Sequence, residues 1–336
     1  MEKLRKSLKI SIAAVLAIVV ADRLGLKYSA TAGIITVLSI QNTKRETIWT
    51  ALKRAAALFC AFLLAAVCFH LIGYNVVAFA VYLFFFAMLC FHMDWVEALA
   101  MVSVLVTHFL TEKNMTGALV RNEIMIFFIG ITFGIAVNLH LHKKKRKFEI
   151  LSDAVDSQIK GILQRMSQWL PRENREEYGS GCFETLDAAL AEAKLCAITN
   201  YNNSMFSNDT YEIDYIKMRE EQSVILKEVY ENIKGLEYLP QQAIQVAALI
   251  KKIEEGYHRK NSAADLIAKT NAFLSRMETR PLPQTREEFE ARAVLFYVLK
   301  QLKSILQIKY EFVKGRQEQE NKKGNITWDI LKKQQS

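Results

Sequence analysis

Apolar residues are distributed unevenly along this sequence. Residues 1–141 contain six apolar runs separated by short polar stretches: Leu8–Ala21, Tyr28–Ile40, Ile48–Ile72, Val76–Phe91, Trp95–Leu110 and Ile124–Leu141. A straight helix needs about 20 apolar residues to cross a bilayer. The third run is long enough and the last comes close, whereas the first two are short and one of them is compatible with a partial or re-entrant span. Because the runs have almost no polar face, the pattern predicts a polytopic bundle of about six membrane spans.

The pattern changes after residue 150, where apolar residues recur at intervals of three and four. This spacing makes one side of a helix apolar. The last long segment shows it in the stripe Leu295, Leu299, Leu302, Leu306 and Val313. Thr285 and Glu288 have the spacing of a capping box just before that stripe. We predict helices over 148–170, 183–205, 210–236, 241–256, 262–279 and 286–316.

The chain is therefore predicted to be all-α and to contain two bundles. The predicted parts are a transmembrane domain over 1–142, a basic juxtamembrane linker over 143–150, a cytoplasmic helical domain over 151–316 and a polar tail over 317–336. The basic run Lys143–Lys147 would attract anionic lipid headgroups. Six short spans make a thin bundle, which favours a symmetric homo-oligomer.

Charge follows the same division of the chain. Residues 151–336 contain equal numbers of basic and acidic side chains, so the net charge of +9 lies within the first 150 residues. Basic residues in an apolar region are typical of a membrane protein whose lysines and arginines set its topology, and they argue against a nucleic-acid partner. With the N-terminus inside, thirteen of these basic residues lie inside and four outside. We therefore predict a multi-pass protein of the cell (plasma) membrane with both termini cytoplasmic.

The sequence contains no motif for catalysis or for metal binding. A Gly-rich phosphate loop, HExxH and GxSxG are all absent, and the five cysteines form neither CxxC nor a metal-ligand spacing. We expect no enzyme activity, no cofactor and no metal. Without a nucleotide site, any transport must use an ion gradient, a partner ATPase or passive flow.

Ionisable residues within or beside the apolar runs are costly in hydrocarbon and are therefore candidate functional groups. Steps of three and four, which place residues on one helix face, connect Asp94, Glu97, Met101, Val104 and His108. With Glu123 at the start of the sixth run, Asp94, Glu97 and His108 are the candidates for proton coupling. The alternative is ion pairing: Asp94 and Glu97 with the basic residues of the third run, and Glu123 with Arg121 or His108.

Two cations and one aromatic residue are the candidates for substrate binding. Arg54, with Lys53, lies at the cytoplasmic end of the third run and would meet a carboxylate with two parallel hydrogen bonds. Trp95 would stack on an aromatic ring. The alternatives are topology and snorkelling for the two cations, and an interfacial or lipid-facing position for Trp95.

A third candidate site lies in the C-terminal half, where charges alternate in sign. Its members are Arg280, Arg286, Glu288 and Arg292. One interpretation is a regulatory site for a small molecule or partner that gates the pore. The other is a capped helix start stabilised by ion pairs.

Several of these stretches resemble the bacterial aromatic acid exporter family, part of the wider fusaric-acid-resistance-like group. In the apolar half they are Tyr28-Ser-Ala-Thr-Ala, Ile40-Gln-Asn-Thr43, Lys53-Arg54, and Asn122-Glu123 followed by Gly130 and Gly134. The more specific match lies in Asp214-Tyr215, Arg219, Gln222 and the run Arg280-Pro-Leu-Pro-Gln-Thr-Arg-Glu-Glu-Phe-Glu-Ala-Arg-Ala293. The resemblance is to the Gram-positive six-span type with a C-terminal cytoplasmic helical domain, and it supplies no agreed set of site residues.

Together, the pattern and the resemblance lead us to expect a secondary exporter of small organic anions, such as aromatic carboxylic acids, driven by proton entry. Two alternatives stay open at this point. One is a passive anion channel gated by the cytoplasmic domain. The other is a membrane-anchored scaffold or sensor without transport.

Overall fold

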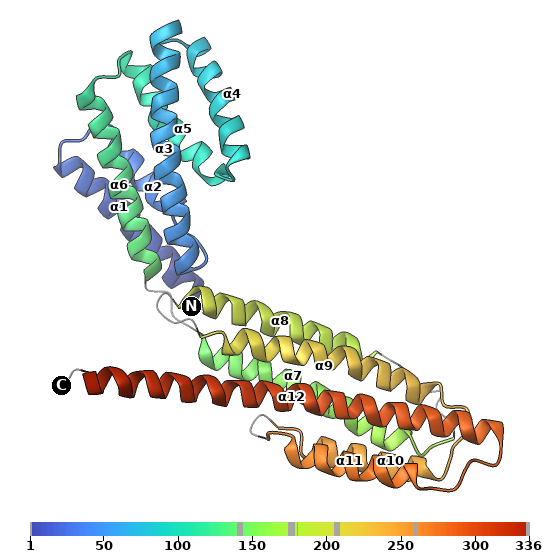
Figure 1. The fold of residues 1–336 in the computed structure, drawn as a ribbon. Helices are drawn as coiled ribbons and strands as arrows, with labels where there is room; N and C mark the ends of the chain where they lie inside the picture. Colours follow the sequence, from blue (N-terminus) through green and yellow to red (C-terminus); the bar gives the residue numbers. More distant parts are fainter. Residues whose placement is uncertain are drawn as a thin grey trace. The chain divides into compact units, whose positions relative to one another are not determined.

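The computed structural model describes residues 2–139, 144–173, 179, 181–204, 209–258 and 261–333, with side chains described between 4 and 318. Within these ranges the regular structure consists of twelve α-helices and no strand, so the all-α prediction is confirmed (Figure 1). The chain divides into two compact units. We call Met1–Lys143 with 202–208 the N-terminal unit, and 144–201 with 209–336 the C-terminal unit.

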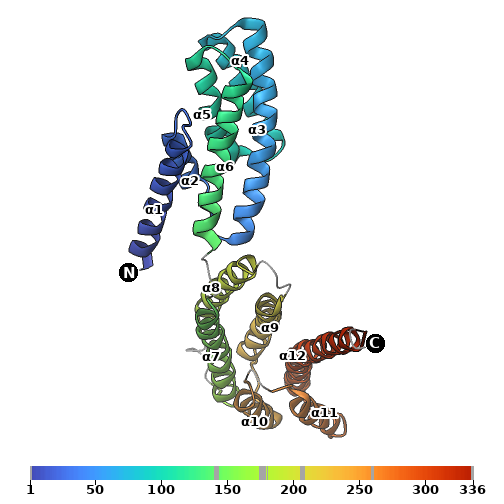
Figure 2. The same ribbon diagram turned by 90° about the vertical axis from the view of Figure 1, so that its left-hand side faces the viewer.

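The N-terminal unit contains one helix for each apolar run of the sequence. These are α1 (Glu2–Arg23), α2 (Ala30–Leu38), α3 (Lys44–Ile72), α4 (Val76–His92), α5 (Val96–Glu112) and α6 (Gly117–Leu139). Among the described residues, α3 and α6 are long and apolar enough to cross a membrane, and α4 is apolar but shorter. Helices α1, α2 and α6 lie side by side (Figures 1 and 2), while α3 packs against α4 and α5.

Helices α1 and α3 bury alanines and expose many of their large apolar side chains, although α3 also buries Leu58, Phe62 and Phe69. On α1, Ala17 and Ala21 are fully buried, whereas the exposed positions include Leu8, Ile12, Val15 and Val19. On α3 the buried positions include Ala57, Ala61 and Ala65, and the exposed ones Phe59, Leu63 and Val67. A protein folding in water would place the large side chains inside, because burial of apolar area is its main driving force.

Two glycines allow α2 and α6 to approach closely. A Cβ atom on Gly130 would lie 2.5 Å from Cγ2 of Ile35, and one on Gly134 would lie 2.5 Å from Cβ of Ser39. The Thr36 hydroxyl also donates to the Gly130 carbonyl oxygen at 3.1 Å. The small-xxx-small spacing of the two glycines therefore serves helix packing.

The C-terminal unit contains α7 (Lys145–Trp169), α8 (Cys182–Asn202), α9 (Tyr211–Lys234), α10 (Gln242–Glu255), α11 (Ala264–Glu278) and α12 (Arg286–Lys333). Helix α9 packs along α12, α10 along α7, and α11 along α12. Thr285 accepts a hydrogen bond from the Glu288 amide at 3.2 Å, as its capping position predicted. Helix α12 runs past the predicted end at residue 316. The basic run lies partly in the first turn of α7, and Lys143 falls outside the described residues.

A buried polar network joins the helices of this unit. Arg219 is fully buried on α9, and its Nε lies 2.9 Å from Oδ1 of Asp156 on α7. The Tyr215 hydroxyl donates to Asp156 at 2.7 Å, and the Gln222 amide donates to the Ile305 carbonyl oxygen of α12 at 2.6 Å. Burial opposes the charge of Arg219, but the neighbouring tyrosine oxygens and Asp156 outweigh it and raise the pKa of the guanidinium.

Candidate functional site

Five of the predicted site residues line one cavity of about 190 Å³ in the N-terminal unit. Lys53 and Arg54 come from the first half of α3, and Glu97 from the first turn of α5. Asp94 and Trp95 come from the turn between α4 and α5. The remaining lining residues are Thr50, Val96 and Ala98.

Lys53 anchors the turn that closes the cavity. Its ammonium lies 2.7 Å from Oδ2 of Asp94 and donates to the Asp94 carbonyl oxygen at 3.0 Å. Asp94 has a positive φ of 55°, and an acidic side chain tolerates this left-handed conformation better than most. Lys53 and Asp94 therefore satisfy each other, and the charge of Lys53 is largely neutralised.

Arg54 is the less satisfied of the two cations. It is only 4% exposed, and its nearest carboxylate oxygen, Oε2 of Glu97, lies 3.9 Å from Nη2, which is too far for a hydrogen bond. Glu97 Oε2 also accepts a hydrogen bond from the Gln41 amide at 3.1 Å. Arg54 Nε is buried without an acceptor among the described residues. A buried cation with an unused N–H beside a cavity is suited to binding an anion.

His108 and Glu123 form a second cluster, at the opposite end of α5. His108 Nδ1 lies 2.7 Å from Oε2 of the fully buried Glu123. The Asn122 amide donates to Oε1 of Glu123 at 2.9 Å, and the Tyr28 ring stacks on the imidazole with centroids 4.0 Å apart. The structure thus pairs Glu123 with His108, in a site where a proton can pass between a carboxylate and an imidazole.

The predicted acid–imidazole stripe along α5 is not continuous, and the placement of Asp94 on it was wrong. Asp94 precedes the helix in a left-handed turn, so it shares no face with the residues that follow. Met101 is buried but Val104 is 38% exposed, so the steps of three and four drift off the interior face. Glu97 and His108 are separated by 11 residues, or about 16 Å of helix, and they belong to two separate clusters.

Sequence reasoning missed the residues that complete the second cluster. Tyr28 and Thr31, whose Oγ1 lies 3.5 Å from His108 Nε2, come from the start of the second apolar run. Lys27 pairs with Glu112 at 3.0 Å at the same end. No spacing in the sequence could reveal these contacts, because they join segments about 80 residues apart.

The predicted regulatory site separates into two groups in the structure. Arg286 pairs with Glu290 at 2.9 Å, and Arg292 with Glu288 at 2.5 Å, in both cases across one turn of α12. These pairs stabilise the start of the helix. Arg280 instead lines a cavity of the C-terminal unit.

Comparisons with known proteins cover both units. Residues 1–141 match the family described as aromatic acid exporter family member 1, and residues 145–310 match the aromatic acid exporter C-terminal domain. The "Uncharacterized protein YqjA" of Bacillus subtilis (strain 168) is 27% identical over 307 residues, which cover 91% of this chain and 95% of that protein. A solved chain from Clostridium difficile 630 is 24% identical and aligns over 49% of this chain and 98% of its own, with a TM-score of 0.43. The resemblance seen in the sequence is confirmed, and the chain belongs to the aromatic acid exporter family.

Proposed function

We propose that this protein is a secondary exporter that moves small organic anions, aromatic carboxylic acids first among them, out of the cytoplasm. Family membership supports export as the activity. The observation that carries the substrate class is Arg54, buried beside the cavity with an N–H that lacks an acceptor. Leaving a buried donor unpaired costs about 1–3 kcal/mol, and a substrate carboxylate toward which the guanidinium turns would relieve this cost. Trp95 in the same cavity offers a ring for stacking.

The size of the cavity bears on how this site works. At about 190 Å³ it is smaller than sites for drug-sized ligands, which start near about 300 Å³. A cavity of about 150 Å³ already holds a benzene ring, so this one accommodates a small aromatic acid, and the α4–α5 turn forms one of its walls. The exposed ion pair of Lys53 with Asp94 closes this turn, so its opening would admit the substrate.

The proposed setting is the cell membrane, with the N-terminal unit spanning it and the C-terminal unit in the cytoplasm. Buried alanines and exposed large apolar side chains on α1 and α3 support lipid as the surrounding solvent. Helix α2 has nine residues, or about 14 Å, so it is proposed as a partial span. The thin bundle also suits a homo-oligomer, and the basic run Lys143–Lys147 suits contact with anionic lipid.

We place proton coupling at the pair of His108 and Glu123. Both are buried and lie 2.7 Å apart, so adding or removing one proton changes the charge of a site that water reaches poorly. Asp94 and Glu97 are exposed beside the cavity and are proposed to pass protons to and from the cytoplasm.

Flux in proteoliposomes tests the proposal. Purified protein would face labelled 4-hydroxybenzoate with and without an imposed pH gradient. We expect accumulation against the substrate gradient that a protonophore abolishes, and at least a tenfold loss in Arg54→Met. Lys9→Met is the matched control. It also replaces a cation by methionine, but at an exposed position of α1 that does not line the cavity.

The outcomes separate the alternatives. Downhill flux that ignores the proton gradient would identify a passive channel. Flux absent for every aromatic carboxylate, together with saturable protein binding by the C-terminal unit, would identify a scaffold. Normal flux in Arg54→Met would remove Arg54 from the substrate site.

A further inference from the structure

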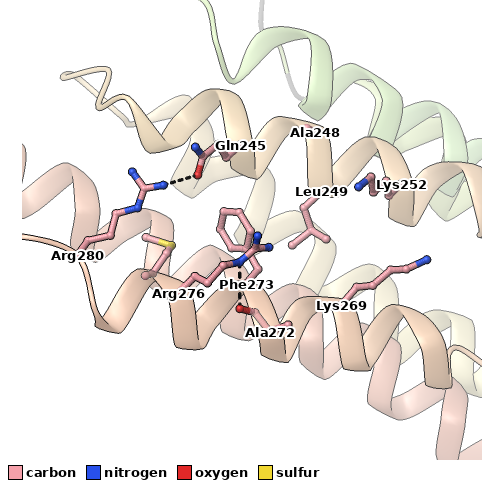
Figure 3. Close-up of a pocket in the computed structure, with 10 residues that line it drawn as sticks. Gln245, Ala248, Leu249, Lys252, Lys269, Ala272, Phe273, Arg276 and Arg280 are labelled. Carbon is pink, nitrogen blue, oxygen red and sulfur yellow. Dashed lines mark hydrogen bonds between the residues drawn. The ribbon is translucent and has the colours of Figure 1, made fainter.

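The C-terminal unit contains a larger cavity between α10 and α11, with a volume of about 410 Å³ (Figure 3). Its α10 lining recurs at steps of three and four: Gln245, Ala248, Leu249 and Lys252. Its α11 side follows the same rule and extends past the helix end: Lys269, Ala272, Phe273, Arg276, Met277 and Arg280. One face of each helix therefore forms the groove.

The groove has an apolar floor and a cationic rim. Leu249 and Phe273 are buried in the floor, while Ala248 and Ala272 leave room above it. Figure 3 shows Arg280 at one end of the groove and a pair of lysines, Lys252 and Lys269, at the other, with Phe273 between the ends.

No carboxylate is among the residues lining this groove. Lys269 pairs with Asp265 outside the lining, at 2.6 Å. The two arginines use neutral acceptors: Arg280 donates to the Gln245 side chain at 2.8 Å, and Arg276 to the Ala272 carbonyl oxygen at 3.3 Å. Their charge is therefore available to an anion, and each guanidinium retains further N–H donors.

We propose that the groove between α10 and α11 binds an aromatic carboxylate, with the ring against Leu249 and Ala248 and the carboxylate at Arg280 and at Arg276, whose guanidinium lies over the Phe273 ring, 5.5 Å from its centroid. The groove itself fits a small anion with an apolar part, because its volume falls in the range of small-molecule sites, its floor is apolar and its rim is cationic. The choice of an aromatic carboxylate rests on the proposed function. The groove lies in a different unit from the cavity at Arg54, so it is a second site for this class of anion. It makes the C-terminal unit a sensor of the anion that the N-terminal unit exports.

Equilibrium dialysis of labelled 4-hydroxybenzoate against the full chain in detergent tests the inference. The Arg54→Met variant serves as the background, so that binding at the N-terminal cavity is removed. We expect one saturable site per chain in this background, and at least a tenfold loss of affinity on adding Arg276→Gln and Arg280→Gln. Both arginines are exposed, so their replacement leaves the fold intact, and the melting temperature checks this.

The matched control adds Lys251→Gln and Arg286→Gln to the same background. These remove the same charge from exposed positions on α10 and α12 that do not line the groove, and affinity should stay within twofold. Three results would overturn the inference: no saturable binding in the Arg54→Met background, equal loss in the control, or displacement by inorganic phosphate at equal concentration. Failure of the transport proposal would be observed in a different experiment. Liposomes containing the wild-type protein would then show no flux, while binding at the groove would persist.

Discussion

Glu123 is a fully buried carboxylate whose two oxygens have different partners, the imidazole of His108 and the amide of Asn122. Glu123→Gln keeps the shape, and its amide can accept from Asn122 and donate to Nδ1 of a neutral imidazole, but it removes the carboxylate that we propose to exchange a proton. We predict that this variant loses at least tenfold in accumulation driven by a pH gradient, while counterflow of 4-hydroxybenzoate stays within twofold. Asp22→Asn, at an exposed position near the end of α1, is the control. Equal loss in both assays would show that Glu123 maintains structure and does not couple protons.

The buried Lys309 of the C-terminal unit makes the free energy of unfolding depend on pH. It is 3% exposed, and burial first and Arg219 next lower its pKa to about 8 from 10.5. Between these pH values the unfolded chain binds more protons than the folded one, so the free energy of unfolding rises with pH there. Below pH 8 both states are protonated and the folded state carries the full cost of the buried charge, at most about 3 kcal/mol.

Lys309→Met should therefore stabilise the protein at pH 7, although it loses the bond from Lys309 to the His258 carbonyl oxygen at 2.6 Å. We expect the melting temperature in detergent to rise by about 2–6 °C at pH 7, and the gain to shrink toward pH 10. A variant that melts lower than the wild type at pH 7, with unchanged pH dependence, would contradict this account.

At the residue scale, sequence reasoning found members of a site but not their partners. The high cost of charge in an apolar region drew attention to Arg54 and Glu123, which are buried, and to Glu97, which is exposed. It could not assign Lys53 to Asp94 or tell which N–H of Arg54 lacks an acceptor. Those facts depend on the path of the α4–α5 turn, and the left-handed conformation of Asp94 leaves no mark in a helical periodicity.

Among the elements, the contact of α2 with α6 depends most on individual residues. Gly130→Ala would gain about 1 kcal/mol in helix propensity, but its Cβ would lie 2.5 Å from Ile35 and 2.8 Å from the Ala32 carbonyl oxygen. The backbone must shift, which costs about 1–3 kcal/mol. We predict a lower melting temperature for Gly130→Ala. Gly161→Ala on α7 meets nothing within 4 Å and should raise it. Equal shifts for both variants would remove close packing as the role of Gly130.

Helix positions were the best predicted level of the fold. Apolar runs located the six helices of the N-terminal unit and periodicity located the six of the C-terminal unit among the described residues, and Thr285 marked the start of α12. Runs, amphipathic spacing and caps are local properties of a sequence. Periodicity could not find the groove between α10 and α11. The cations Lys269, Arg276 and Arg280 do recur on one face at steps of seven and four, but a solvated face shows the same pattern. Only the packing of two helices distinguishes a groove from a surface.

At the scale of the whole molecule, the distribution of charge sets which ends of the helices face the cytoplasm. The bias of lysine and arginine predicts that the turn after α5 is outside and that the C-terminal unit is inside. Lys113 is exposed in that turn, and Lys251 is exposed on α10. Each can carry a single cysteine in a chain whose five native cysteines are replaced by alanine.

In intact cells, a membrane-impermeant maleimide should label Lys113→Cys at once and Lys251→Cys only after permeabilisation. The prediction rests on the free energy of moving basic residues across the bilayer. Moving the thirteen inner cations is far less favourable than moving the four outer ones. The reverse pattern would place the groove of α10 and α11 outside, where it could not sense cytoplasmic anion. It would also turn Arg54 toward the exterior, where it could not meet an anion arriving from the cytoplasm. The labelling pattern therefore determines the topology and the side of the membrane on which the cavity at Arg54 lies, since that side follows from which end of α3 carries the buried guanidinium.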